Sequence, residues 1–153
     1  GLYNLGVILM NEIGGSMGPI YGTIFMEMSD LEDLEEIQLD KFINMLKKGL
    51  EGLNEIVEAR VGDKTLVDTL APAIESLIKA QSDKLDFIQA LQNMKIAAVE
   101  GRDTTKELVA KFGRSSRLGE RSRGVLDAGA VSCCIILTAM ADGMMELISK
   151  EYC

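Results

Sequence analysis

The sequence predicts an all-α fold, and three observations support this prediction. Apolar residues recur three or four positions apart along most of the chain, which is the spacing of one buried helix face. No segment shows the sustained apolar–polar alternation and β-branched enrichment of a strand. A hydrophobic content of 47% over 153 residues supplies enough material for the core of one domain.

The first part of the chain predicts three helices. Two of them, near residues 2–13 and 19–30, are divided by a glycine-rich turn, after which Pro19 suits the first helical position. A longer helix is expected near residues 39–59, where leucine, isoleucine and phenylalanine keep the helical spacing. The acidic segment 30–36 is interpreted as a loop or an exposed helix end, because runs of like charge are usually solvated.

The middle of the chain predicts three more helices, near residues 64–80, 83–100 and 102–112. We expect Asp63 to cap the first of them, because a carboxylate at that position accepts an otherwise unpaired backbone N–H. Pro72 has no N–H to donate, so it is expected to kink this helix or to lie near its edge.

Residues 113–128 show no helical periodicity, and they precede a last helix expected near residues 129–150. Segments of this length without regular structure are uncommon in compact domains and are often functional. This one holds four arginines, whereas the whole chain has a net charge of −8. We interpret it as an ordered anion-binding loop, and a mobile surface loop is the alternative.

Composition excludes several classes of function. The negative charge argues against a nucleic-acid partner, and the absence of histidine excludes histidine bases, metal ligands and phosphohistidine carriers. The cysteines Cys133, Cys134 and Cys153 suggest neither a disulfide framework nor a zinc site, which favours a cytoplasmic setting. We expect no signal peptide at Gly1 and no membrane span, because the uncharged stretch 128–141 is too short.

The glycine-rich turn at residues 14–18 is a candidate phosphate site. Glycine lets the backbone approach a ligand closely, and the helix that follows presents unpaired N–H groups to an anion. Because Gly14, Gly18 and Gly22 recur every four residues, close packing between two helices is the competing interpretation.

A second candidate is the segment 62–68, where a helix start would again offer free amides. Thr65 would add a hydroxyl, Lys64 a positive charge, and Leu66 an apolar surface for a flat base. An ordinary capped helix start is the alternative here.

The third candidate is the segment 113–128. Its Arg114 and Arg121 are suited to pair with a phosphate through two hydrogen bonds each. Asp127 is expected to cap the last helix rather than to act in catalysis.

Taken together, these motifs resemble one family. The segments Gly-Gly-Ser-Met-Gly-Pro-Ile-Tyr-Gly (14–22), Gly-Asp-Lys-Thr-Leu-Val-Asp (62–68), Gly-Arg-Ser-Ser-Arg-Leu-Gly-Glu-Arg-Ser (113–122) and Asp-Ala-Gly-Ala (127–130) follow the order and spacing of dihydroxyacetone kinase L subunits. The resemblance covers nearly the whole chain. It implies an antiparallel helical barrel or bundle, with residues 1–153 as a single nucleotide-binding domain whose N-terminal portion is missing.

The resemblance also implies a phosphotransferase subunit that depends on two partners. In the phosphoenolpyruvate-dependent form, bound ADP is recharged to ATP by a phosphohistidine on an M-type subunit, and dihydroxyacetone is phosphorylated while a K-type subunit holds it. No catalytic side chain is expected in this chain, because phosphoryl transfer depends mainly on positioning and charge stabilisation.

The nucleotide pocket can be carried over position by position. The resemblance assigns the phosphates to the first glycine turn, the adenine to the second segment, a nucleotide contact to the arginine of the third, and closure over the ligand to the turn before the last helix. The residues at these positions are Gly14, Gly15, Ser16, Met17, Thr65, Leu66, Arg114, Asp127, Ala128 and Gly129.

Two features depart from the family pattern. The Mg²⁺ ligands of the family lie in a Gly-Asp-x-Asp-His-Gly motif before the first glycine turn; this sequence has no such motif, so we expect the ligands upstream of Gly1. Met17 replaces a common serine, and Ala128 replaces the usual proline. These substitutions motivate the alternative of a divergent regulatory or interaction homologue that binds nucleotide or a partner without kinase activity.

Overall fold

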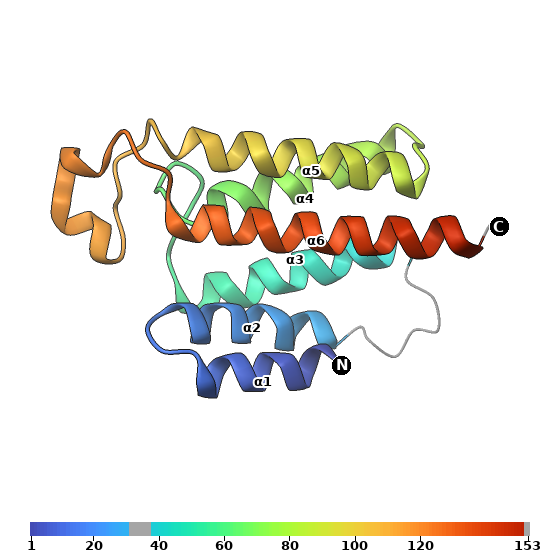
Figure 1. The fold of residues 1–153 in the computed structure, drawn as a ribbon, viewed down its shortest axis with the longest axis horizontal. Helices are drawn as coiled ribbons and strands as arrows, with labels where there is room; N and C mark the ends of the chain where they lie inside the picture. The colour runs from blue at the N-terminus through green and yellow to red at the C-terminus, as the bar shows by residue number, and fades with distance from the viewer. Residues whose placement is uncertain (31–37, 152–153) are drawn as a thin grey trace. The chain divides into compact units, whose positions relative to one another are not determined.

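The computed structural model describes residues 1–30 and 38–151 (Figure 1). Over these residues the chain forms six α-helices and one 3₁₀ helix and contains no strand, which confirms the all-α prediction. The helices fall into two compact units, Gly1–Glu58 and Ala59–Cys153, here called unit 1 and unit 2. Apart from Asp30, which follows a helix end and is exposed, the acidic segment 30–36 lies outside the described residues.

Unit 1 contains three helices: α1 (Leu2–Glu12), α2 (Met17–Ser29) and α3 (Leu39–Ile56). Glycines bring α1 and α2 into close contact. A Cβ atom placed on Gly18 would lie 2.2 Å from the Ile13 carbonyl oxygen, and one on Gly22 would lie 2.9 Å from the Gly6 carbonyl oxygen. Helix packing therefore explains Gly18 and Gly22, as the competing interpretation had it.

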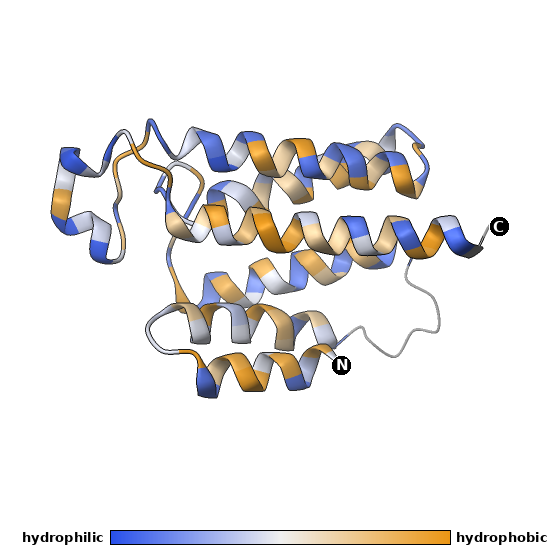
Figure 2. Cartoon of the chain, viewed as in Figure 1, coloured by the Kyte–Doolittle hydropathy of each residue, from blue (hydrophilic) through white to orange (hydrophobic). Residues whose placement is uncertain are grey.

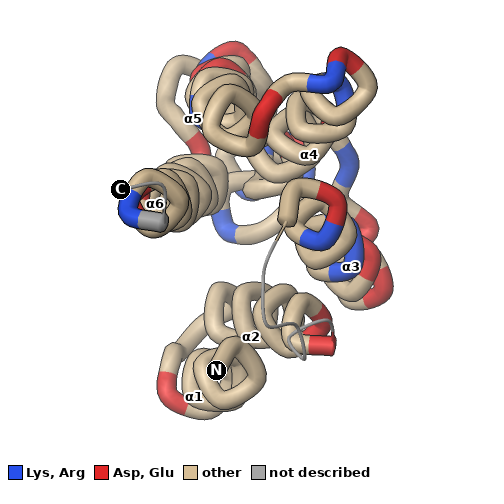
Figure 3. Tube along the Cα trace, turned by 90° about the vertical axis from the view of Figure 1, so that its right-hand side faces the viewer, with Lys and Arg blue, Asp and Glu red and all other residues tan. Residues whose placement is uncertain are grey.

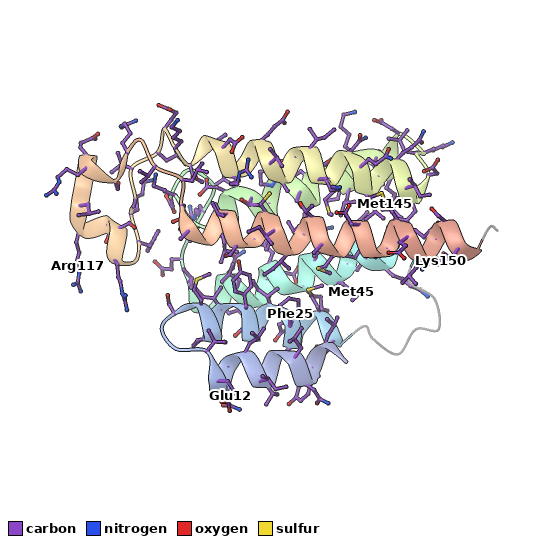
Figure 4. All side chains as sticks on the ribbon, viewed as in Figure 1. Glu12, Phe25, Met45, Arg117, Met145 and Lys150 are labelled. Carbon is purple, nitrogen blue, oxygen red and sulfur yellow. The ribbon has the colours of Figure 1, made fainter. Side chains whose placement is uncertain are left out.

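The core of unit 1 lies along α2 and α3. Its buried side chains include Phe25 and Met28 on α2 and Phe42 and Met45 on α3. Phe25 and Met45 are labelled in Figure 4. Apolar residues also dominate α1 and α2 in Figure 2, and these two helices carry few charges in Figure 3, whereas α3 carries both signs.

Unit 2 contains three α-helices and the 3₁₀ helix: α4 (Val67–Ser82), α5 (Phe87–Thr104), η1 (Arg114–Ser122) and α6 (Ala128–Glu151). Helices α4 and α5 form an antiparallel hairpin (Figure 1). Asp86 begins α5 with a capping box, in which its carboxylate accepts the Gln89 N–H at 2.8 Å. The buried side chains include Leu77, Leu91 and Leu137, one from each α-helix.

The prediction of a helix over residues 102–112 is wrong. Helix α5 continues to Thr104, and the chain then leaves the helix through a turn. The hydroxyls of Thr104 and Thr105 donate to the carbonyls of Gly101 and Arg102 at 2.7 and 2.6 Å. Side-chain bonds of this kind compete with helix propagation, which explains why α5 ends here.

Pro72 lies inside α4, where its missing N–H leaves the Asp68 carbonyl without its usual helical partner. Helix α5 meets α4 at this point. A Cβ atom on Gly101 would lie 2.2 Å from the Asp68 carbonyl oxygen and 3.3 Å from Cγ of Pro72. The proline and the glycine thus together form the close contact of the hairpin.

Helix α6 is the one helix of the described chain that is long and apolar enough to cross a membrane by length and composition. This is weak evidence, since a core helix passes the same test. Five buried residues, each at most 4% exposed, recur along it at helical spacing: Ala130, Cys133, Cys134, Leu137 and Ala141. One stripe of α6 is therefore buried, whereas only 22% of its most apolar 18-residue window is buried in the structure.

Candidate functional site

The turn before α2 is the candidate phosphate site of unit 1. Gly15 has a φ of 75°, and a Cβ atom at Gly14 or Gly15 would meet nothing within 4 Å. Ser16 occupies the N-cap position of α2, but its side chain makes no capping hydrogen bond, and Met17 is half-buried. An open turn at a helix start is suited to an anion, because its backbone can be approached closely.

The turn before α4 is organised around Asp68. This side chain is 1% exposed, and its two carboxylate oxygens accept the N–H groups of Gly62 at 2.6 Å and Thr65 at 2.8 Å. Gly62 and Lys64 have φ values of 96° and 62°, so the backbone reverses tightly here. Helix α4 therefore begins at Val67 and not at residue 64 as the sequence predicts.

Asp63 does not cap α4. Its carboxylate accepts the Arg60 N–H at 2.8 Å and lies 2.6 Å from the Lys111 ammonium. The hydrogen bond from Lys111, followed by that from Arg60, lowers the pKa of Asp63. The capping prediction for this residue is therefore wrong, because its carboxylate binds Arg60 and Lys111 and no side chain of the described residues caps α4.

Lys64 does not offer a free charge to a phosphate. The residue is 2% exposed, and its ammonium donates to the carbonyl oxygens of Thr105 and Val125, each at 2.5 Å. A buried ammonium needs such acceptors, since an unpaired charge inside a protein is costly. The expected phosphate contact of Lys64 is thus replaced by a contact inside unit 2.

The turn before α6 confirms the predicted cap. The Asp127 carboxylate accepts the Ala130 N–H at 2.8 Å, and the Asp127 N–H donates to Oγ1 of Thr105 at 3.0 Å. Burial raises the pKa of Asp127, although the hydrogen bonds from Ala130 and Gly129 oppose this shift. A carboxylate that is short of solvent and bound to a helix start is well positioned but not free to act as a base.

Leu66 meets this turn. A Cβ atom placed on Gly129 would lie 3.4 Å from the Leu66 nitrogen and 3.5 Å from its Cβ. Leu66 is buried, Thr65 and Gly129 are half-buried, and Ala128 is exposed. The predicted site residues of unit 2 that precede α4 and α6 are therefore neighbours.

The segment between α5 and α6, residues 105–127, is here called the arginine loop, and it projects beyond the ends of both helices (Figure 1). Its centre is η1, which bends at Gly119 with a φ of 53°. Its base is closed, because the Gly124 N–H donates to the Lys106 carbonyl at 2.7 Å and the Arg123 guanidinium donates to the Glu107 carbonyl. The segment 113–128, for which the sequence predicts no helix, thus contains the 3₁₀ helix η1, and its binding of an anion stays a prediction.

The arginines of this loop differ in their environment. Arg123 forms an ion pair with Glu120 at 3.1 Å and donates to the Glu107 carbonyl. Arg114, Arg117 and Arg121 are exposed, and no ion pair holds their side chains among the described residues. Figure 4 shows Arg117 pointing away from the helices. These three guanidinium groups are free to meet an anion.

The described residues do not fit a magnesium site by themselves. No group of three or more metal-ligating side chains lies together in the described parts of the chain. The carboxylates of Asp63, Asp68 and Asp127 all accept backbone N–H groups instead. We therefore assign no metal ligand to these residues.

One surface hollow of unit 2, of about 250 Å³, lies elsewhere. It is formed by the C-terminal part of α4 and by α5, and its lining includes Ser76, Lys79, Asn93 and Glu100. It contains none of the predicted site residues, and Thr65 and Leu66 lie before the opposite, N-terminal end of α4.

Sequence reasoning missed the buried polar residues that hold these turns. Asp68, Thr105 and Ser122 are each at most 1% exposed, and the Ser122 hydroxyl accepts the Ala110 N–H at 2.9 Å and donates to the Gly119 carbonyl at 2.7 Å. Asp68 and Ser122 carried a signal, since they are the last residues of the 62–68 and 113–122 motifs. Thr105 resembles an ordinary surface residue in the sequence, because it lies in none of the motifs.

The chain is similar to one protein family over most of its length. The DAK2 domain model matches residues 2–142. The ADP-binding subunit DhaL of PEP-dependent dihydroxyacetone kinase 1 from Listeria innocua serovar 6a is 36% identical over 137 residues, which cover 88% of this chain and 63% of that subunit. The ADP-binding subunit DhaL of the Escherichia coli K12 enzyme is 32% identical over 151 residues, which cover 98% of this chain and 70% of the subunit.

Kinases of other substrates are also similar. The L-erythrulose kinase of Pectobacterium atrosepticum is 30% identical over 132 residues, or 86% of this chain and 22% of that enzyme. The chain thus spans roughly two thirds of the DhaL subunits and a smaller share of this longer kinase.

Proposed function

The chain belongs to the DAK2 domain family, and from this membership we propose that it is the ADP/ATP-binding subunit of a phosphoenolpyruvate-dependent dihydroxyacetone kinase. The observation that carries the proposal is the 36% identity to an ADP-binding subunit over 88% of the chain. We propose a cytoplasmic protein of one nucleotide-binding domain over residues 1–153.

The proposed roles of unit 2 follow from its turns. Leu66, which lies against Gly129 and is 4% exposed, is the apolar side chain proposed to lie beneath the adenine. Asp127 fixes the turn of Ala128 and Gly129 by capping α6, so that this turn has a defined position beside the base. Arg114 at the start of η1 supplies a positive charge for the nucleotide, since it is exposed and unpaired among the described residues.

The proposed role of unit 1 is phosphate binding by backbone amides. The turn of Gly14, Gly15, Ser16 and Met17 is open, and no side chain within the described residues caps the helix that follows. Thr65 in unit 2 is proposed as a further polar contact. Such amides and guanidinium groups stabilise charge without taking part in bond making.

A bound ADP would receive a phosphoryl group from the phosphohistidine of an M-type partner and pass it to dihydroxyacetone on a K-type partner. The absence of histidine in this chain agrees with that division of labour, because the phosphohistidine belongs to the partner. Mg²⁺ is part of the proposal as a companion of the nucleotide, and the described residues contain no group of three or more side chains that could hold it.

A second candidate function is a divergent regulatory or interaction homologue that has the fold without kinase activity. Met17 and Ala128 favour it, since a thioether and a methyl group stand where the resemblance expects a hydroxyl and a proline. A coupled assay with K-type and M-type subunits separates the two, because turnover excludes the second and tight partner binding without turnover excludes the first.

Calorimetric titration with ADP in the presence of Mg²⁺ tests the main proposal. We expect binding by the full-length protein at micromolar or tighter affinity, and a roughly tenfold or larger loss in Arg114→Ala, because a charge-assisted hydrogen bond contributes about 1.5–3 kcal/mol. Arg117→Ala is the matched control, since Arg117 is an exposed arginine of the same helix η1. A full-length protein that binds no ADP would overturn the proposal.

A further inference from the structure

We propose that Lys64 is a positioning residue, whose buried ammonium joins the two ends of the arginine loop and thereby fixes the turn before α6. The proposal rests on the proposed function only for its effect on nucleotide affinity. Its effect on the loop itself stands on the structure of unit 2.

The first support is the place of the two acceptors of Lys64. Thr105 is the first residue of the arginine loop, and Val125 lies close to the end of it. The ammonium donates to both carbonyl oxygens at 2.5 Å, although they lie 41 and 61 residues along the chain from Lys64. One side chain therefore spans the base of the loop.

The second support is the burial of the ammonium. Lys64 is 2% exposed, and within the described residues no carboxylate forms an ion pair with it. A buried ammonium must keep its hydrogen-bond acceptors or be destabilised strongly. The ammonium therefore holds the two carbonyls in place. If the ends of the loop separated, the ammonium would either become exposed or stay buried without hydrogen-bond acceptors.

The third support is the path from Lys64 to the proposed nucleotide contacts. Thr105 is completely buried, and its Oγ1 accepts the Asp127 N–H at 3.0 Å. Asp127 caps α6 through Ala130, and the neighbouring Gly129 lies against Leu66. Lys64 thus acts on the Asp127 turn through Thr105, while Leu66, two residues after Lys64, meets the same turn.

The test compares Lys64→Met with the wild type by amide exchange in residue-resolved NMR. Methionine retains the length of the stem and loses the charge. We expect the Gly124 and Asp127 amides, which close the loop base, to exchange at least about tenfold faster, whereas amides in the middle of α3 and α5 keep their rates. Lys106→Met is the matched control, because Lys106 is an exposed lysine of the same loop.

Nucleotide affinity is the second readout. Lys64→Met is expected to weaken ADP binding by about tenfold or more, and Lys64→Arg to restore part of the protection and of the affinity. Unchanged exchange at Gly124 and Asp127 in a folded Lys64→Met protein overturns the proposal. Equal acceleration of every amide also overturns it, since Lys64 would then contribute only to global stability.

A second pair of variants covers the case in which Lys64→Met does not fold. Thr105→Val removes the acceptor of the Asp127 N–H with little change in volume, and Thr105→Ser retains it. Faster exchange at Asp127 in the valine variant alone supports the path, and equal rates in both variants overturn it. If the wild type binds no ADP while Lys64→Met still loosens the loop base, only the proposed function fails.

Discussion

Polar residues in the interior of unit 2 determine the geometry of its turns. Asp68 gathers two N–H groups of the turn before α4, Lys64 joins the ends of the arginine loop, and Ser122 connects η1 to Ala110. Each of these groups is satisfied, and no buried side-chain nitrogen or oxygen lacks a partner in the described residues. Fully paired polar groups of this kind specify one conformation of a loop.

Asp127 makes stability depend on pH in a defined direction. Its pKa is raised in the folded state, so the fold binds this proton more tightly than the unfolded chain does. Asp127 therefore makes its full contribution to the stability of the fold below its ordinary pKa of 3.8. This contribution is lost as the pH rises through the raised pKa of the folded state. Asp63, whose pKa is lowered, acts in the opposite direction and loses its contribution as the pH falls.

Asp127→Asn tests this sign. The amide oxygen can still accept the Ala130 N–H, but the side chain no longer ionises. We expect the free energy of unfolding of the variant, relative to wild type, to increase as the pH is raised from about 4 to about 7. Urea denaturation at several pH values measures it, and a difference that is constant across this range would contradict the prediction.

At the scale of elements, the α4–α5 hairpin depends on a contact between backbones. Pro72 frees the Asp68 carbonyl, and only a glycine at position 101 leaves room for it. Glycine inside a helix normally lowers stability, since it loses more backbone entropy than alanine does. Its presence in α5 is therefore explained by the close approach.

Gly101→Ala is expected to destabilise the protein by about 1–3 kcal/mol, because the new Cβ atom would force α5 away from α4. Gly143→Ala in α6 is the matched control. A Cβ atom there meets nothing within 4 Å, so the substitution is expected to stabilise by roughly 0.5–1 kcal/mol. Thermal or urea unfolding of both variants gives the comparison, and a stabilised Gly101→Ala protein would refute the contact.

At the scale of the whole molecule, the proposed function needs partners. The chain has no histidine to carry a phosphoryl group, and the proposal assigns the phosphohistidine and the dihydroxyacetone to other subunits. The relatives named ADP-binding subunits are longer than the matched region. Activity is therefore expected from an assembly of the full-length protein.

Reconstitution tests this expectation. The full-length protein with K-type and M-type subunits should phosphorylate dihydroxyacetone at the expense of phosphoenolpyruvate, and omission of any one subunit should abolish the activity. A coupled assay of product formation measures it. Turnover by this subunit with ATP and dihydroxyacetone alone would contradict the division of labour. In the complete assembly, Arg114→Ala is expected to have reduced activity and serves as a comparison.

The sequence by itself predicted the all-α fold, most helix positions and the family, because helical periodicity and caps such as Asp127 depend on residues a few positions apart. Its motifs also marked the turns that precede α2, α4 and α6. Whether these turns bind a nucleotide stays a prediction.

Only the tertiary structure decided how the charges and glycines of those motifs are used. Lys64 is buried because the carbonyls of Thr105 and Val125, far along the chain, meet its ammonium, and no local pattern encodes that meeting. The packing role of Gly18 likewise depends on a neighbouring element, because α1 lies against it. Periodicity is local information, whereas burial of a polar group is a property of the whole unit.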